Sequence, residues 1–351
     1  MVTRNLKKCS ASYYANKISS LEDIFGTDNI VLKEQVIIIN GHSYPVVDDV
    51  IILLDPAQYP SSLSKLLSSY TSILPNVNLG DFAEDIQFTF GAEWLTYPDI
   101  LPEHEEEFSL YFDILDTSTL ESSRVCDLGC GIGRWSYFLK DKCRELILVD
   151  FSEAIFAARK NLKESSNAIF FMRDLKRLPF KKDFADILFC LGVLHHLPVD
   201  ALKEVVALKK YAPTILIYLY YALDNRPLHF RVLLKMVTLV RVYVARVKNP
   251  SFRNCFSSFI AYTVYLPLVY LGKLMKTLGL SQQIPLFEGY DKKTVKRIEQ
   301  DVYGRFFTQI EQSVTKKQIL ELEKDFSEMT ISDNIPYWHF KCETKPAPHD
   351  K

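Results

Sequence analysis

Apolar and polar positions alternate through the middle of the chain in short blocks that are typical of an α/β protein. Five apolar runs of strand length lie between residues 124 and 220, and stretches of helical length separate them. Strands that alternate with helices form a mainly parallel sheet with helices on both of its faces. The runs predict strands at 124–128, 145–150, 168–173, 185–191 and 213–220, with helices centred near 135–141, 153–163 and 200–210.

The two ends of the chain follow other patterns. Residues 1–80 hold β-branched runs around a turn at Gly41, which predict a small β-rich module, and then a Ser- and Pro-rich linker or loosely packed helix at 57–80. The acidic stretch 103–107 predicts the solvated first turn of a helix that buries Phe108, Tyr111, Phe112 and Leu115. A helix at 315–326 and a hairpin at 329–342 are expected to complete the sheet.

Residues 224–285 interrupt the alternation. The stretch 228–247 is apolar but, together with Lys248 just after it, has five cations on one broad helical face, and 256–271 is apolar and aromatic. Neither stretch is long and uniform enough to predict a transmembrane helix. Three interpretations stay open: a helical cap over an active site, a surface that contacts anionic membrane through 228–280, and a dimer interface. The expected domains are 1–80, 81–223, 224–300 and 301–345.

Composition excludes few function classes. The net charge of −1 over 351 residues favours no polyanion, so nucleic acid is not an expected partner. The seven cysteines form no CxxC pair, which predicts free thiols in a reducing compartment and no bound metal. Residues 1–20 lack the apolar core of a signal peptide. We expect a cytoplasmic protein, with membrane association through the insertion as an alternative and the oligomeric state open.

The stretch 125–134 has the clearest chemical pattern. An apolar run leads into Gly129, Gly131 and Gly133, and an amphipathic segment follows, which predicts a buried strand, a tight turn and the first turns of a helix. Glycine lets a ligand approach the backbone closely, and free amides at the start of a helix suit a polar or anionic group. Asp127 places a carboxylate just before the turn.

Two more carboxylates follow predicted strands. Asp150 ends the second strand, where it can accept both hydroxyls of a ribose, and Asp174 follows the third, where it can bind an adenine amino group. The carboxyl ends of parallel strands are where such sheets bind ligands. A dinucleotide site prefers G-x-G-x-x-G, whereas this turn reads G-x-G-x-G with Arg134 after it. Asp127 would repel a pyrophosphate, so a cationic ligand suits the turn better.

Together, the stretch 125–134, Asp150, Asp174 and the segment 184–197 resemble the class I S-adenosylmethionine-dependent methyltransferases. Within them the chain is most similar to the broad type 11/12-like group whose fourth strand runs into Leu-His-His-Leu. The resemblance implies a doubly wound, Rossmann-like, seven-stranded sheet with a helical insertion after strand 5. The pattern after Gly41 resembles a zinc-ribbon-like module found ahead of some bacterial methyltransferase domains, here without the metal cysteines.

The resemblance also implies a cofactor site for S-adenosyl-L-methionine. Its methionine part is expected at the aspartate and backbone of the glycine turn, its ribose and adenine at the ends of the second and third strands, and its sulfonium after the fourth. In that order, the implied residues are Asp127, Gly129, Gly131 and Gly133, then Asp150 and Phe151, then Asp174 and Leu175, and last Leu191 and Gly192.

The acceptor side is less determined. His195 and His196 are candidate bases, or else only cap the turn after the fourth strand. The remaining candidates either contact substrate or belong to the packed core; they are Trp94, Tyr97, Tyr220 and Tyr221. The same two alternatives apply to Arg305, Trp338 and His339. The sequence predicts methyl transfer to a small-molecule, lipid- or sugar-derived acceptor. A catalytically silent S-adenosylmethionine-binding protein and an NAD-dependent oxidoreductase are the alternatives.

Overall fold

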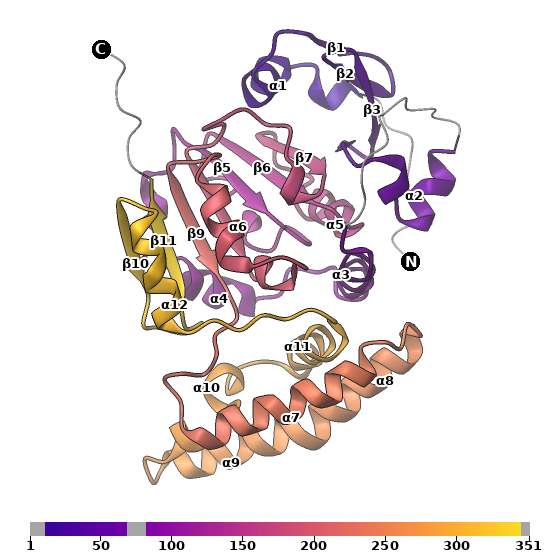
Figure 1. Ribbon diagram of the computed structural model, residues 1–351. Coiled ribbons are helices and arrows are strands. Elements are labelled where there is room, and N and C mark those ends of the chain that lie inside the picture. The colour runs from indigo at the N-terminus through magenta and orange to yellow at the C-terminus, as the bar shows by residue number, and fades with distance from the viewer. Residues whose placement is uncertain (1–10, 69–81, 345–351) are drawn as a thin grey trace.

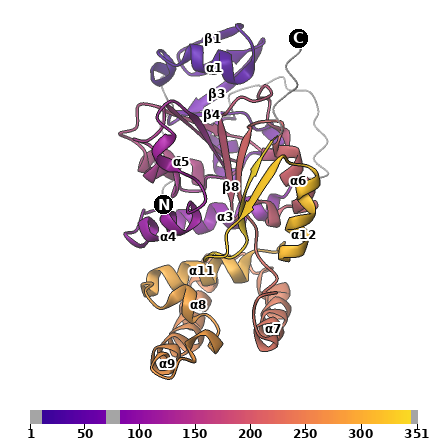
Figure 2. The same cartoon turned by 90° about the vertical axis from the view of Figure 1, so that its left-hand side faces the viewer.

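One mixed sheet with helices on both faces forms the body of the protein (Figures 1 and 2). The structure is a computed structural model, and it describes residues 11–68 and 82–344. Its strands run in the order β1-β2-β3-β4-β7-β6-β5-β8-β9-β11-β10. The strands are β1 (Ile30–Leu32), β2 (Val36–Ile39), β3 (His42–Val47), β4 (Val50–Ile52), β5 (Arg124–Leu128), β6 (Glu145–Asp150), β7 (Ala168–Met172), β8 (Ile187–Leu191), β9 (Thr214–Tyr218), β10 (Glu328–Ile331) and β11 (His339–Glu343).

The centre of the sheet is parallel, as the apolar runs predict. β7, β6, β5, β8 and β9 pair in parallel, and β11 then pairs antiparallel with both β9 and β10. Every residue of β5, β6, β7 and β8 is buried, because helices cover both faces. One apolar core lies under α1 (Ile18–Phe25), α6 (Ala201–Leu208) and α12 (Lys316–Leu320), and the other under α2 (Ser61–Leu66), α4 (Glu103–Tyr111) and α5 (Ala154–Asn161).

The N-terminal strands correct the expected seven-stranded sheet, which has eleven strands instead. β4 pairs in parallel with β7, with Val50 opposite Phe170, so β1–β4 extend the sheet. The ring hydroxyl of Tyr13 also donates to the carbonyl of Ala168 at 2.7 Å. The physical reason lies in β4, whose three residues are all buried, and in the free backbone groups of the β7 edge, which take a further strand.

One helix prediction also differs from the structure. The segment after the glycine turn forms only the short 3-10 helix η5 (Ser136–Phe138), because its aromatic residues pack inward against α4 within a few residues of β6. No long helix therefore begins at the turn. The Ser- and Pro-rich linker contains α2, and its remaining part, 69–81, lies outside the described residues.

The insertion folds into helices below the carboxyl ends of the parallel strands (Figures 1 and 2). Tyr265, Val302 and Phe306 belong to a separate small core there. α11 contacts α3, α7 and α8, which joins the insertion to the N-terminal helix α3. These helices are α3 (Glu84–Thr96), α7 (Leu228–Val244), α8 (Pro250–Ile260), the π-helix η8 (Ala261–Tyr265), α9 (Leu266–Lys276), α10 (Phe287–Tyr290) and α11 (Val295–Phe307).

α8, η8 and α9 run on as one helix, which the sequence pattern did not predict. It spans Pro250–Lys276, 27 residues, with a best-window mean hydropathy of 1.4, and 28% of that window is buried. By length and composition alone it is sufficient to cross a membrane, a property that core helices of soluble proteins share. The π-turn of η8 ends two residues before Pro267, which has no backbone N–H to donate.

Candidate functional site

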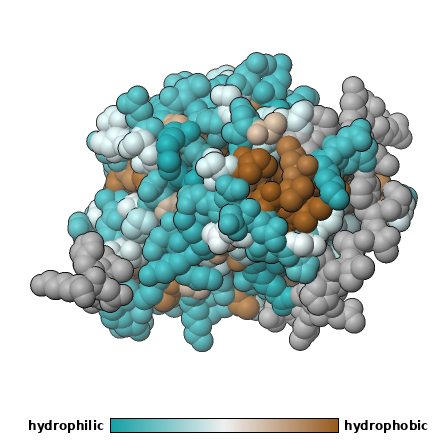
Figure 3. Space-filling model, turned by 90° about the horizontal axis from the view of Figure 1, so that it is seen from above, coloured by the Kyte–Doolittle hydropathy of each residue, from teal (hydrophilic) through white to brown (hydrophobic). Residues whose placement is uncertain are grey.

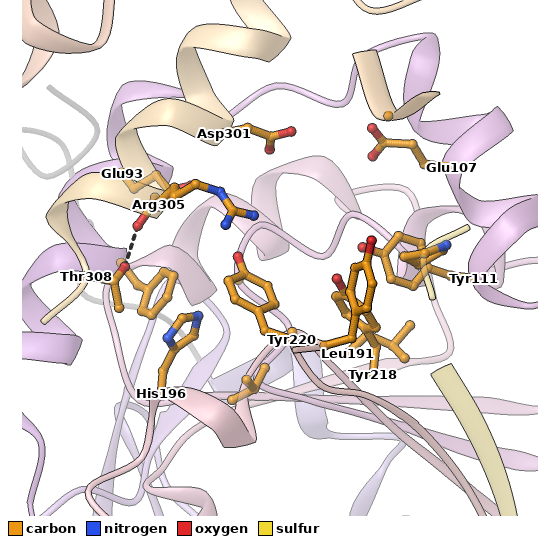
Figure 4. A pocket seen from close by; sticks show the side chains of 18 of the residues that line it. Glu93, Glu107, Tyr111, Leu191, His196, Tyr218, Tyr220, Asp301, Arg305 and Thr308 are labelled. Atoms are coloured by element: carbon orange, nitrogen blue, oxygen red, sulfur yellow. Dashed lines mark hydrogen bonds between the residues drawn. The ribbon is translucent and has the colours of Figure 1, made fainter. Parts of the chain in front are cut away.

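A cavity of about 720 Å³ lies between the carboxyl ends of the central strands and the helices of the insertion (Figure 4). Its floor comes from the glycine turn and from the residues that follow β6, β7, β8 and β9. Its sides and roof come from α3, α7, α10 and α11. This is the edge of the sheet at which α/β proteins bind their ligands.

The glycine turn has the backbone conformation that only glycine adopts easily. Gly129, Gly131 and Gly133 have φ angles of 79°, 54° and 70°. Gly129 and Gly131 line the cavity, whereas Gly133 does not, because it faces Leu162, whose Cδ1 would lie 2.7 Å from an added Cβ. Two of the three glycines thus bring the backbone to the cavity, and the third permits close packing beneath it.

Two buried carboxyl groups accompany the turn without a cationic partner. Asp150 lines the cavity and accepts hydrogen bonds from the Gly131 amide at 2.9 Å and the Ser152 hydroxyl at 2.6 Å. Asp127 lies below the turn, outside the cavity wall, and accepts from the Ser136 hydroxyl at 2.6 Å. Burial raises the pKa of Asp127 to about 7 and the pKa of Asp150 above its ordinary value. Neither forms an ion pair with a described residue, so the pair suits a cationic ligand.

Most of the other residues expected at the cofactor also line the cavity. Asp174 follows β7 and accepts a hydrogen bond from the Lys176 amide at 3.0 Å. Of the ten residues expected to hold the cofactor, eight line the cavity, and the two exceptions are Asp127 and Gly133. The eight are Gly129, Gly131, Asp150, Phe151, Asp174, Leu175, Leu191 and Gly192.

The two histidines of η7 (Leu194–His196) have different positions. His196 lines the cavity, and its Nδ1 donates to the Ile310 carbonyl at 2.8 Å, so Nε2 of the neutral ring is an acceptor. Burial lowers the pKa of His196 to about 4. His195 does not line the cavity: it is fully buried and stacks on Tyr220 at 3.9 Å between ring centroids. Of the two histidines, only His196 therefore remains a candidate base.

The aromatic candidates divide in the same way. Trp94 lines the cavity beside Gly131, whereas Tyr97 does not and contacts Tyr303 at 6.3 Å between ring centroids. Tyr220 and Tyr221 both line the cavity.

Arg305, Trp338 and His339 also differ in their positions relative to the cavity. Arg305 lines the cavity 5.4 Å from the centroid of the Tyr220 ring (Figure 4), and it forms no hydrogen bond or ion pair with another described residue. Trp338 and His339 lie outside the cavity wall. Trp338 donates a hydrogen bond to Asp224 at 2.7 Å, and Nε2 of His339 lies within hydrogen-bond distance of Asp113, at 2.6 Å.

Glu107 corrects the prediction of a solvated acidic turn. It is buried, lines the cavity, and pairs with Lys293 at 2.9 Å, Arg297 at 3.2 Å and Arg134 at 3.5 Å. Burial alone would raise its pKa, but the three cations outweigh burial and hold the pKa well below the usual value. Arg297 lies on α11, Lys293 just before it, and Arg134 just after the glycine turn. Because these partners are distant in sequence, no local pattern around 103–107 could reveal them.

Glu93 is a site residue that the sequence reasoning missed. It lies on α3 among the cavity-lining residues, only 5% exposed, and its Oε2 has no hydrogen-bond partner among the described residues. Burial raises its pKa to about 8. The available signal was an acidic residue between the apolar Phe90 and Trp94 of the same helix. In the described ranges no group of three or more His, Cys, Asp or Glu is arranged to hold a metal ion.

Comparison with known proteins agrees with this site. Residues 125–210 match the family model of a methyltransferase domain. No curated protein matches the chain in sequence. Among solved structures, phosphoethanolamine N-methyltransferase 1 of Haemonchus contortus, in complex with phosphoethanolamine and S-adenosylhomocysteine, is 20% identical with a TM-score of 0.32. The match covers 41% of this chain and 34% of that one.

A second structure is a SAM-dependent methyltransferase from Aquifex aeolicus, 19% identical with a TM-score of 0.32, and the match covers 36% of this chain and 71% of that chain. At these TM-scores the likenesses say nothing of the substrate. The family match covers most of the strands and turns that form the cavity floor, from Val125 to beyond β8, but not β9 and the residues that follow it. Residues 125–210 of this chain are thus similar to a methyltransferase domain.

Proposed function

We propose that this protein transfers a methyl group from S-adenosylmethionine to a small-molecule, lipid- or sugar-derived acceptor. The observation that supports it best is the joint position of the glycine turn and Asp150 in the wall of a single large cavity. That cavity also extends beyond the glycine turn to residues of α7, α10 and α11, which gives room for an acceptor. The acceptor and the atom that is methylated are part of the proposal.

The residues of the cavity floor fit the cofactor. The Gly129 and Gly131 backbone permits close approach, and Asp150 keeps lone pairs for ribose hydroxyls while it accepts from the turn. Asp127 adds negative charge beneath the turn and favours a cationic ligand above it. When bound, the cofactor supplies an activated methyl group on a sulfonium. The protein's own task is then to bind, to orient the acceptor and to exclude water.

Proton removal from the acceptor, where it is needed, falls to Glu93 or His196 in this proposal. A general base works best when its pKa is near the ambient pH. Glu93, with a pKa of about 8, meets this condition better than His196, with a pKa of about 4. His196 keeps Nε2 as a hydrogen-bond acceptor, since its Nδ1 donates to the Ile310 carbonyl. We therefore assign proton acceptance to Glu93 and orientation of the acceptor to His196.

A transfer assay tests the proposal. The protein is incubated with S-adenosylmethionine that has a labelled methyl group, together with a water-soluble metabolite extract or a lipid extract. We expect label to enter one of the two extracts, and the variant Asp150→Ala to lose that transfer. Binding of the cofactor without transfer to either extract would contradict methyl transfer and favour a silent binding protein.

A further inference from the structure

The insertion holds most of the apolar surface of the protein. Of the twenty large hydrophobic residues that are exposed among the described ranges, sixteen lie between residues 228 and 280. Leu239 and Leu274 are 66% and 64% exposed, and Tyr243 is 73% exposed. Seen from the opposite end, the side of α1 and β1, the surface is mostly polar with one compact apolar patch (Figure 3). We call the exposed side of α7, α8, η8 and α9 the insertion surface.

The charge of residues 225–287, the part of the insertion that forms α7, α8, η8 and α9, has one sign only. Residues 225–287 contain nine Lys and Arg and no Asp or Glu, although the whole chain has 42 basic and 43 acidic residues. Lys248 pairs with Asp85 of α3. Five exposed cations form no ion pair with a described residue; they are Arg231, Lys235, Arg246, Lys273 and Lys276. Apolar residues flanked by such cations are typical of helices that lie on anionic lipid.

The cavity opens onto this same surface. Leu233, Val237 and Ile260 line its apolar part. Met236, Val240 and Val264 line the cavity too, and they are 60%, 46% and 39% exposed. The cavity is therefore open between α7 and η8, on the insertion surface. A molecule that enters there passes from an apolar outer face along apolar side chains towards the glycine turn.

We propose that the insertion surface docks on an anionic phospholipid bilayer and that the cavity takes an amphipathic lipid acceptor from that bilayer. The acyl chain lies against α7 and Ile260, and the reacting group points to the glycine turn. Methyl transfer to this lipid rests on the proposed function, whereas the docking does not.

Other occupants of the surface fit less well. In a symmetric dimer the same face meets itself, so the five unpaired cations would face one another. A membrane-spanning helix would expose all its sides to lipid, but Arg253 and Ser257 of α8 are buried against the protein, and Arg253 Nε donates to the Val247 carbonyl at 2.7 Å. The helix therefore presents one side only, as a helix does that lies in the membrane interface.

Vesicle flotation of the full chain tests the docking. We expect recovery with vesicles of equal parts phosphatidylcholine and phosphatidylglycerol, at least tenfold above pure phosphatidylcholine, and a loss at high salt. Leu239→Glu with Leu274→Glu should lose at least tenfold of the vesicle binding. The matched control is Leu320→Glu on α12, an exposed leucine outside the insertion, which should float like the unchanged protein.

Two further readouts separate the parts of the proposal. Calorimetric titration with S-adenosylmethionine should be unchanged in the double variant, so flotation without cofactor binding contradicts the proposed function alone. No flotation with intact cofactor binding contradicts the docking alone. The protein could instead show no flotation and form a dimer in light scattering that the double variant abolishes. That result would overturn the docking and show that a second copy of the chain covers the insertion surface.

Uptake of a lipid into the cavity has its own test. Trp94 and Trp135 line the cavity, so vesicles with brominated acyl chains should quench tryptophan fluorescence more than unbrominated ones. Equal fluorescence with both kinds of vesicle, despite flotation, would overturn the uptake of the lipid.

Discussion

Trp94 of α3 lies against Gly131 of the glycine turn, so closely that a Cβ at residue 131 would come 3.1 Å from the indole Nε1. The guanidinium of Arg134 lies 5.5 Å from the Trp94 ring and 4.1 Å from the Trp135 ring. A helix that precedes the strands of the core thus closes one side of the turn. Trp94 therefore belongs to the site, whereas its neighbour Tyr97 belongs to the packing against α11.

This contact predicts that Gly131→Ala weakens cofactor binding. The added methyl group strains a left-handed backbone position and pushes Trp94 towards the cavity, so we expect at least a tenfold lower affinity for S-adenosylmethionine in calorimetry. Gly41→Ala is the matched control, because Gly41 also has a positive φ, 80°, but nothing within 4 Å. Equal losses in both variants would show that backbone strain, not the site, determines the effect.

Cofactor binding should release protons near neutral pH. With a pKa of about 7 the Asp127 carboxyl is partly protonated there, and a cationic ligand above it favours the ionised form. The apparent affinity is expected to rise with pH between about 6 and 8 and then to level off. Titrations in two buffers of different ionisation enthalpy measure the released protons. Asp127→Asn should abolish the part of the release that belongs to Asp127, and an affinity that falls over this range would speak against the assignment.

Glu93→Gln should change both stability and rate. The folded-state pKa of about 8 is above the unfolded value, so the folded protein retains a proton that the unfolded chain loses. Between about pH 5 and 8 the original protein should lose stability relative to the variant by roughly 1.4 kcal/mol per pH unit, as urea unfolding at several pH values can measure.

In the transfer assay the rate should rise with pH up to about 8, and the variant Glu93→Gln should lose this rise. A variant with the same pH–rate profile would exclude Glu93 as the proton acceptor.

The ion pair of Arg241 and Glu311 should be essential for the position of α7. Its atoms are 2.5 Å apart, and the side chains are 7% and 3% exposed. Arg241→Met leaves a buried carboxylate without a partner, which should cost about 3–5 kcal/mol of unfolding free energy. Arg241→Met with Glu311→Gln should recover most of it. Lys248→Met removes an exposed pair with Asp85 and should cost below about 1 kcal/mol. Similar costs for the two single variants would contradict the burial argument.

The parallel core could be predicted from the sequence because each strand is a continuous apolar run that both faces of the sheet bury. Most of the residues expected at the cofactor could be placed at the cavity because they lie at or just after the ends of those strands. Long-range pairings could not be predicted. β4 joins β7 across more than a hundred residues, and Glu107 meets Arg297 across nearly two hundred, so neither leaves a local pattern.

The insertion shows the same limit at the surface. The sequence places Arg241 on the cationic face with Arg231 and Lys235, yet Arg241 turns inward to Glu311 while the other two are exposed. Helical spacing predicts on which side of the helix a residue lies. It does not predict which charge becomes buried, because the partner that buries it comes from a distant segment.

Calorimetric titration of the full chain with S-adenosylmethionine, and separately with NAD, tests the central claim most directly. Asp150 in the cavity floor and Asp127 beneath it are buried carboxyl groups with no described cation paired to them. They predict saturable binding of S-adenosylmethionine at one site, with proton release near pH 7, and no binding of NAD. Binding of NAD in preference to S-adenosylmethionine, or binding of neither, would contradict the account.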